Sequence, residues 1–230
     1  MWRWQRNLAT LVRPTHNRVN MGEIREKIIA TYAEWTALSA LRSGAPIKSR
    51  YDVYGVLRAC SFDVLFNKSL GPLSGSEFNR WHRGTTMAIV QREPRLTVGW
   101  ATKIVNVYLK TRAYIGAQGR HHLSEALHPP IDAGLWLGLR RRFADRPDIL
   151  EHTHCVETIR AIVDYECYER IIRGCRLAAA ELGCKLIEVE QLWAGTEVPT
   201  RPKLRMQPTG RGGPELRSGT NLHEAKLRKR

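Results

Sequence analysis

The chain has 230 residues and a mass of 26.3 kDa, enough for one domain or two small lobes with a sizeable core. Its 37 Lys and Arg residues exceed the 22 Asp and Glu residues, and the formal net charge of +15 favours a polyanionic partner, above all nucleic acid. The sequence lacks a long apolar run, which excludes a transmembrane segment, and its five cysteines without a Cys-x-x-Cys pair predict reduced thiols and a cytoplasmic location.

Helical periodicity dominates from residue 21 onward. Residues 1–20 hold four arginines and no acid, so we expect a basic extension outside the packed domain. A first helix is expected after Asn20, with apolar side chains recurring at helical spacing: Ile24, Ile28, Tyr32, Trp35 and Leu38. Residues 51–66 are apolar on a helical period, and Ser74 followed by Glu77 predicts the start of another helix.

The central part of the chain contains the residues with polar or charged side chains that are candidates for a functional site. An amphipathic helix is expected around residues 101–109, with Lys103, Asn106 and Lys110 on its polar face. Pro129 and Pro130 then favour the start of a new helix with Asp132 at or near its N-terminus.

Helical signals continue to the end of the expected domain. A long helix is expected over 153–182, ended by Gly183, and residues 186–193 fit either a strand or a helix. The sequence therefore predicts an all-α fold, a compact bundle of about six to eight helices in one or two lobes with a cleft between them, over residues 21–195. Residues 196–230 are basic and poor in large apolar side chains, so we expect a disordered tail.

Two segments within residues 97–140 resemble known catalytic elements. The first runs from Gly99 to Lys103, and the second is Pro130-Ile131-Asp132. They are similar to parts of the helix-hairpin-helix DNA glycosylases, and more closely to the 8-oxoguanine branch, in which a Gly-Thr-Lys helix start supplies a lysine and a Pro-Val-Asp element supplies a carboxylate. This chain has two more residues between glycine and lysine, and residues 92–99 replace the Gly-rich hairpin that precedes the lysine in that family.

The resemblance implies an enzyme that flips a modified nucleobase out of DNA and excises it, in DNA repair or in defence against phage with modified DNA. Lys103 would attack the sugar C1′ and form a Schiff base that also supports strand cleavage, the activity of an AP lyase. Asp132 would stabilise the positive charge on the sugar or help activate the nucleophile. We expect DNA as the partner, no membrane association, a monomer and no cofactor.

Further candidates surround these two residues in the sequence. A flipped base needs flat apolar surfaces, and we expect the base pocket to contain Trp100, Trp136, Trp81 and His82. Phosphate contacts are expected from Lys110, Arg140, Arg141 and Arg142. His152, His154 and Cys155 lack a second ligand pair at zinc-finger spacing, so no metal site is predicted.

Two other functions fit the same sequence. In the first, the chain is a non-enzymatic, basic helical nucleic-acid-binding protein, and Lys103 is one phosphate contact among many. In the second, the chain is a protein-interaction module whose basic tail binds an acidic partner.

Overall fold

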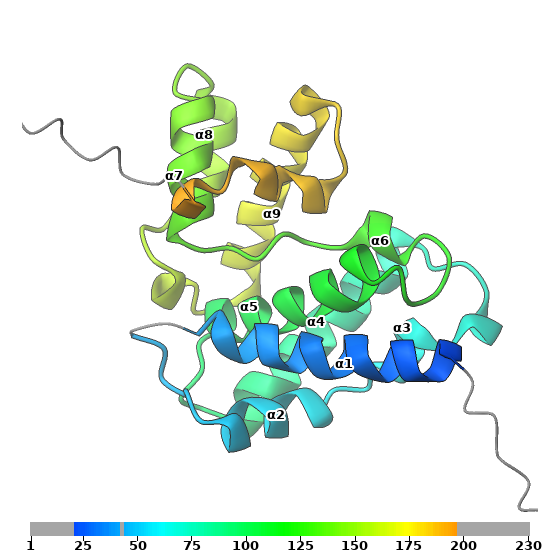
Figure 1. The fold of residues 1–230 in the computed structure, drawn as a ribbon. Helices are drawn as coiled ribbons and strands as arrows, with labels where there is room; N and C mark the ends of the chain where they lie inside the picture. Colours follow the sequence, from blue (N-terminus) through cyan, green and yellow to red (C-terminus); the bar gives the residue numbers. More distant parts are fainter. Residues whose placement is uncertain (1–20, 42–43, 197–230) are drawn as a thin grey trace, which may run out of the picture. The chain divides into compact units, whose positions relative to one another are not determined.

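The regular elements are all helical in the computed structural model, which describes residues 21–41 and 44–196 (Figure 1). This confirms the all-α prediction for the described residues. The expectations for residues 1–20 and for the tail beyond residue 196 lie outside these ranges. In chain order the elements are α1 (Met21–Ser39), α2 (Arg50–Arg58), α3 (Asp63–Phe66), η1 (Lys68–Leu70), α4 (Gly75–Arg92), α5 (Val98–Leu109), η2 (Lys110–Ile115), α6 (Leu123–Ala126), α7 (Ala133–Arg142), α8 (Pro147–Thr153), η3 (Ile159–Ala161), α9 (Tyr165–Leu182), η4 (Leu186–Leu192) and η5 (Ala194–Thr196).

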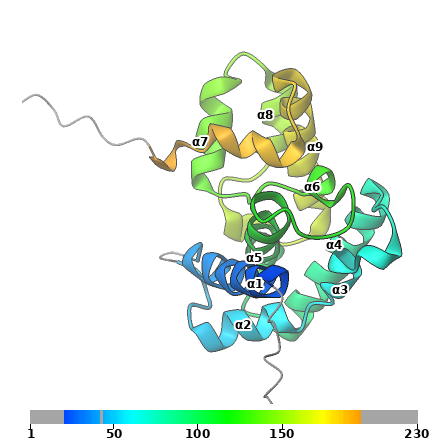
Figure 2. The same cartoon turned by 45° about the vertical axis from the view of Figure 1, so that its right-hand side comes forward.

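Helix α5 lies at the centre of these elements, between α1 and α9 (Figures 1 and 2). All 12 of its residues are buried. Lys103 and Asn106, which were expected on the polar face of this helix, are covered as well as the apolar stripe. A helix buried on every side can carry such residues only where distant segments provide polar partners.

The core consists of two hydrophobic clusters, and α5 contributes residues to both. The first contains α5 itself with residues of α1, α2, α4 and α6, and the second contains residues of α7, α8 and α9. Val98, the first residue of α5, belongs to the second cluster. The helix that carries Lys103 thus borders both clusters, and its position is fixed by packing from both.

Helix α1 packs on α5 through small residues. Ala33 and Ala37 are fully buried, and such small side chains let two helix backbones approach closely. Three larger apolar residues of the predicted stripe lie outward instead, with Ile28 62%, Tyr32 53% and Trp35 49% exposed, whereas Leu38 packs against the first cluster. This leaves two aromatic rings of α1 on the surface.

The predicted helix boundaries are confirmed in some places and wrong in others. Ser74 caps α4 by accepting from the backbone N–H of Glu77, and Gly183 ends α9 with a φ of 63°. The long helix expected from residue 153 begins only at Tyr165, because Asp164 caps α9 by accepting from the N–H of Cys167. The ambiguous segment at 186–193 forms the 3-10 helix η4.

The chain before α9 lies directly against the N-terminal end of α5. The N–H of Gly99 donates to the carbonyl of Ile162 over 3.0 Å. A Cβ at position 99 would lie 2.1 Å from the carbonyl oxygen of Ile159, so only glycine permits this approach. Gly99 therefore brings η3 close to the helix that carries Lys103.

None of the helices in the described ranges combines the length and the apolar character that a bilayer-spanning helix needs.

Candidate active site

Lys103 and Asp132 meet across the interior of the fold. The Nζ atom of Lys103 donates to Oδ2 of Asp132 over 3.2 Å. The lysine side chain is only 10% exposed and the aspartate side chain 24%. Because both groups are largely removed from water, their charges act on one another and on a bound molecule more strongly than a surface ion pair would.

Asp132 caps helix α7 and pairs with the lysine at the same time. One carboxylate oxygen, Oδ1, accepts from the backbone N–H groups of Gly134 and Leu135 over 3.0 and 3.1 Å. The other oxygen faces Lys103. The cap fixes the orientation of the carboxylate and so directs Oδ2 toward the amine.

Trp193, which was not predicted from the sequence, supplies a third hydrogen-bond donor to Oδ1 of Asp132. Its indole Nε1–H donates to Oδ1 of Asp132 over 2.9 Å. The contact depends on Gly134 and Gly138, one turn apart on α7: added Cβ atoms would lie 2.1 Å from Trp193 Nε1 and 1.7 Å from the carbonyl oxygen of Leu192. Two glycines on one face of α7 thus bring the chain after η4 against the capped end of the helix.

We predict that Trp193→Phe, which keeps an aromatic ring but loses the N–H, lowers the free energy of unfolding by about 1 to 2 kcal/mol. Gly134 and Leu135 still donate to Oδ1, so the fold should persist. Chemical denaturation measures the effect. Trp35→Phe is the control, since that indole lines the same cleft from α1. Equal stability of Trp193→Phe and the parental protein would contradict the prediction.

A second ion pair lies beside the first. Nζ of Lys110 donates to Oε1 of Glu190 over 2.6 Å, and both side chains are about three quarters buried, at 25% and 24% exposure. Burial raises the pKa of Glu190, and the charge of Lys110 partly offsets that rise. Glu190 was not predicted from the sequence, because the apolar residues of this segment, which forms η4, fit a strand as well as a helix.

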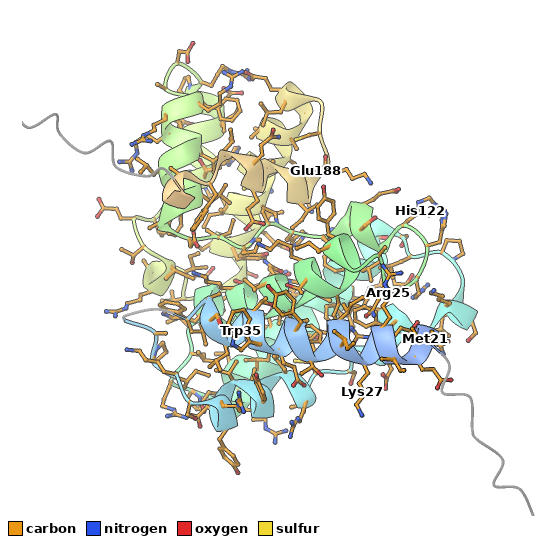
Figure 3. The ribbon with its side chains drawn as sticks, viewed as in Figure 1. Met21, Arg25, Lys27, Trp35, His122 and Glu188 are labelled. Carbon is orange, nitrogen blue, oxygen red and sulfur yellow. The ribbon has the colours of Figure 1, made fainter. Side chains whose placement is uncertain are left out.

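Both ion pairs line one cleft of about 810 Å³. Tyr32 and Trp35 of α1 stack at its edge, with ring centroids 5.5 Å apart and planes 21° apart. Figure 3 shows Trp35 and Met21 toward opposite ends of α1. The remaining lining residues come from α1, α5, η2, η3, α7 and the chain between and after them: Thr36, Ser39, Ala40, Gly44, Trp100, Val107, Thr111, Ile115, Pro130, Ala133, Gly134, Thr158, Ile159, Arg160, Trp193 and Gly195.

Of the four residues expected to form the base pocket, Trp100 lines the cleft, with Nζ of Lys103 5.8 Å from its ring centroid. The other three do not line this cleft. Trp136 lies in the second hydrophobic cluster and donates to the carbonyl of Thr153. Trp81 packs between Phe62 and Phe78 and donates to the carbonyl of Ser61, while His82 is fully buried. Aromatic residues at helical spacing here fill the core.

The cations expected to contact phosphates occupy two different places. Lys110 lies in the cleft, paired with Glu190. Arg140, Arg141 and Arg142 are exposed in the last turn of α7. At about 1.5 Å per residue they lie roughly 12 to 15 Å along the helix from Asp132, and they do not line the cleft.

His82 belongs to a buried polar network that links α4, α5 and α9. Its Nε2 lies 2.9 Å from Oδ1 of Asn106, and its Nδ1 lies 2.7 Å from the hydroxyl of Tyr165. The Asn106 amide nitrogen donates to the hydroxyl of Tyr168, which in turn lies 3.0 Å from Nδ1 of His128. Burial lowers the pKa of His82 to about 4 and that of His128 well below its usual value, so both rings are neutral.

These neutral histidines predict a loss of stability in acid. The unfolded chain takes up protons near pH 6.5 while the folded chain does not, so stability should fall as the pH drops from about 6.5 to 4, by about 3 kcal/mol for His82 alone. In His82→Gln that contribution is removed, whereas the exposed carboxylates titrate as before. Urea unfolding at a series of pH values measures both proteins. Parallel curves for the two proteins across this range would overturn the assignment.

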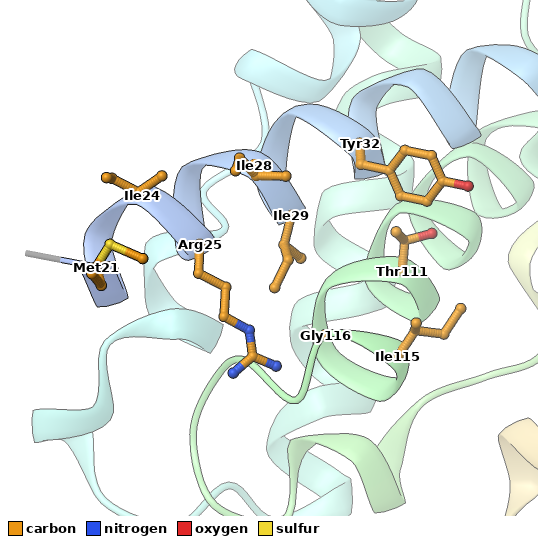
Figure 4. Close-up of a pocket in the computed structure, with 9 residues that line it drawn as sticks. All are labelled: Met21, Ile24, Arg25, Ile28, Ile29, Tyr32, Thr111, Ile115 and Gly116. Atoms are coloured by element: carbon orange, nitrogen blue, oxygen red, sulfur yellow. The ribbon is translucent and has the colours of Figure 1, made fainter.

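A second cavity, of about 390 Å³, lies along α1 and the end of η2 (Figure 4). Its lining is mostly aliphatic, and Arg25 is the charged side chain among the described residues that form it. A cavity of this composition offers no pair of acid and base. The cleft with the two ion pairs is therefore the better candidate for chemistry.

The described residues contain no cluster of three or more His, Cys, Asp or Glu side chains arranged to hold a metal ion.

Comparisons of the chain with protein-family models, with curated proteins and with solved structures found no match.

Proposed function

We propose that the chain is a DNA glycosylase that excises a modified nucleobase, acting in DNA repair or in defence against phage with modified DNA. The observation that carries the proposal is the Lys103–Asp132 pair at 3.2 Å inside a cleft. An amine and a carboxylate at this distance are the two groups needed to replace a base at C1′ of a deoxyribose.

In the proposed reaction, the bond between C1′ and the base nitrogen breaks first, and its electron pair leaves with the base. The departing base takes a proton from the ammonium of Lys103, so Nζ becomes a free amine. The Asp132 carboxylate stabilises the positive charge that develops on the sugar. Nζ of Lys103 then bonds to C1′ and passes a proton to Oδ2 of Asp132, the carboxylate oxygen within hydrogen-bond reach. The bond between C1′ and the ring oxygen then breaks, and the ring oxygen takes the proton back from Asp132. The Schiff base that forms can proceed to strand cleavage by β-elimination.

The dimensions and lining of the cleft support this reaction. Its volume of about 810 Å³ falls in the range of small-molecule sites and exceeds that of a single nucleobase. Trp100 and Trp193 provide flat apolar surfaces close to the ion pair. A base extruded from DNA requires such surfaces because it loses its stacking on both neighbours.

Non-enzymatic nucleic-acid binding remains the alternative function, and the burial of Lys103 bears on it. A lysine that contacts phosphates needs access to the DNA backbone, yet this side chain is 10% exposed and already paired. The exposed arginines at the end of α7 and the net charge of +15 suit DNA binding in either case. The position of Lys103 therefore favours a chemical role.

The proposal is tested by base release from a panel of duplexes, each with one modified base: an oxidised purine, an alkylated purine, uracil, or a hydroxymethylated or glycosylated pyrimidine. We expect free base from at least one duplex, measured by mass spectrometry. Salt-dependent binding without release from any duplex would indicate the non-enzymatic alternative. No binding at all would indicate a protein-interaction module.

A further inference from the structure

Helix α5 holds the segment that leads into Asp132 at two points. Lys103 contacts Asp132 itself. Asn106, about 4.5 Å further along the helix axis, donates from Nδ2 to the carbonyl of Pro129 over 3.2 Å. Pro129 and Pro130 have no backbone N–H, so this segment has fewer donors of its own with which to fix its position. The side chain of Asn106, on helix α5, supplies a donor to this segment.

The orientation of the Asn106 amide follows from its partners. The carbonyl of Pro129 can only accept, so Nδ2 must face it and Oδ1 must face His82. His82 therefore carries its proton on Nε2, and its Nδ1 accepts from the hydroxyl of Tyr165. Nδ2 also donates to the hydroxyl of Tyr168 over 2.9 Å. Asn106 is 1% exposed, and a reversed amide would leave buried groups unsatisfied.

We infer that Asn106 is a positioning residue for the Lys103–Asp132 pair, an inference that rests on the proposed glycosylase function. His82 and Tyr168 contact Asn106 directly and hold it in one orientation. Asn106 holds the backbone at Pro129, and that backbone leads three residues later to the carboxylate opposite Lys103. Loss of the contact should displace Asp132 relative to the amine. A displacement of about 1 Å between reacting groups reduces a rate by on the order of 10²-fold.

Asn106→Asp tests the role with little change in volume. The aspartate places an oxygen against the carbonyl of Pro129 in place of a donor, so the two repel. We expect the single-turnover rate of base release to fall by on the order of 10²-fold. The Kd for DNA should stay within about threefold, because the change does not reach the exposed cations.

Tyr165→Phe is the matched control. It removes one hydrogen bond from the same buried network, at His82, without touching Asn106 or Pro129. We expect a smaller fall in melting temperature than for Asn106→Asp and a turnover rate near the parental one. If both variants lose rate in proportion to their loss of stability, Asn106 is only a structural residue and the inference is overturned.

A second measurement is independent of catalysis. The rate at which an amine-reactive ester labels Lys103, read by mass spectrometry against the exposed Lys48, reports how firmly the ion pair is held. We expect faster labelling of Lys103 in Asn106→Asp than in the parental protein or in Tyr165→Phe. Unchanged labelling would overturn the inference. If the parental protein released no base, the glycosylase proposal would fail, while this labelling would still decide whether Asn106 positions the pair.

Discussion

Lys103→Gln should abolish base release, with a loss in single-turnover rate on the order of 10⁴-fold or more, because the amine is the proposed nucleophile. Glutamine is nearly as long as lysine and can still donate a hydrogen bond to Asp132, so the buried site keeps a partner for the carboxylate. The protein should therefore still fold, with a lower melting temperature because the carboxylate loses its counter-charge, and the Kd for DNA should change little. Turnover, thermal melting and DNA binding are measured on the same preparation.

Lys110→Gln provides the comparison for that result. This lysine lies seven residues further on, lines the same cleft and is also paired with a carboxylate. Its loss should cost about tenfold or less, since it contacts neither Asp132 nor the reacting carbon in the proposed mechanism. Equal losses in the two variants, or turnover by Lys103→Gln at the parental rate, would show that the nucleophile is not Lys103.

Asp132→Asn should lower the single-turnover rate by about 10²-fold or more while leaving the fold intact. Asparagine caps helices about as well as aspartate, so its side-chain oxygen still accepts from Gly134 and Leu135. The change removes the negative charge that would face the sugar in the proposed mechanism. DNA should bind equally well or more tightly, because an anion near the phosphates has gone.

Asp164→Asn is the control for the cap. Asp164 caps α9 as Asp132 caps α7, by accepting a backbone N–H, but it does not line the cleft. Asp164→Asn should cost less than about 1 kcal/mol of stability. Asp132→Asn should cost more, because it leaves the buried ammonium of Lys103 without a counter-charge, and it alone should affect turnover. If Asp132→Asn had lower stability but parental turnover, Asp132 would act only as a helix cap.

Features encoded by neighbouring residues could be predicted from the sequence. Pro129 and Pro130 stop one helix and favour another, which placed Asp132 at the N-terminus of α7. Ser74 and Glu77 likewise located the start of α4. Asp164 is a similar local signal, and it explains why the expected helix over 153–182 begins only at Tyr165.

Features that depend on distant segments could not be predicted in this way. A periodic apolar stripe indicates one buried face of α5, but the partners that allow Lys103 and Asn106 to be buried lie 29 and 23 residues further along the chain. Trp193 and Glu190 reach the cleft because η4 packs on α7. The sequence signal for this packing is the pair Gly134 and Gly138, four residues apart. Glycines at this spacing leave one face of a helix without side chains, so another segment can approach its backbone closely.

The most direct test of the central claim is covalent trapping of the protein on DNA. The protein is incubated with a duplex from which it releases base, in the presence of borohydride, and is then digested and analysed by mass spectrometry. We predict one reduced sugar adduct, on the peptide that contains Lys103, because only a Schiff base is converted to a stable bond. Base release without an adduct, or an adduct on another amine, would contradict the account.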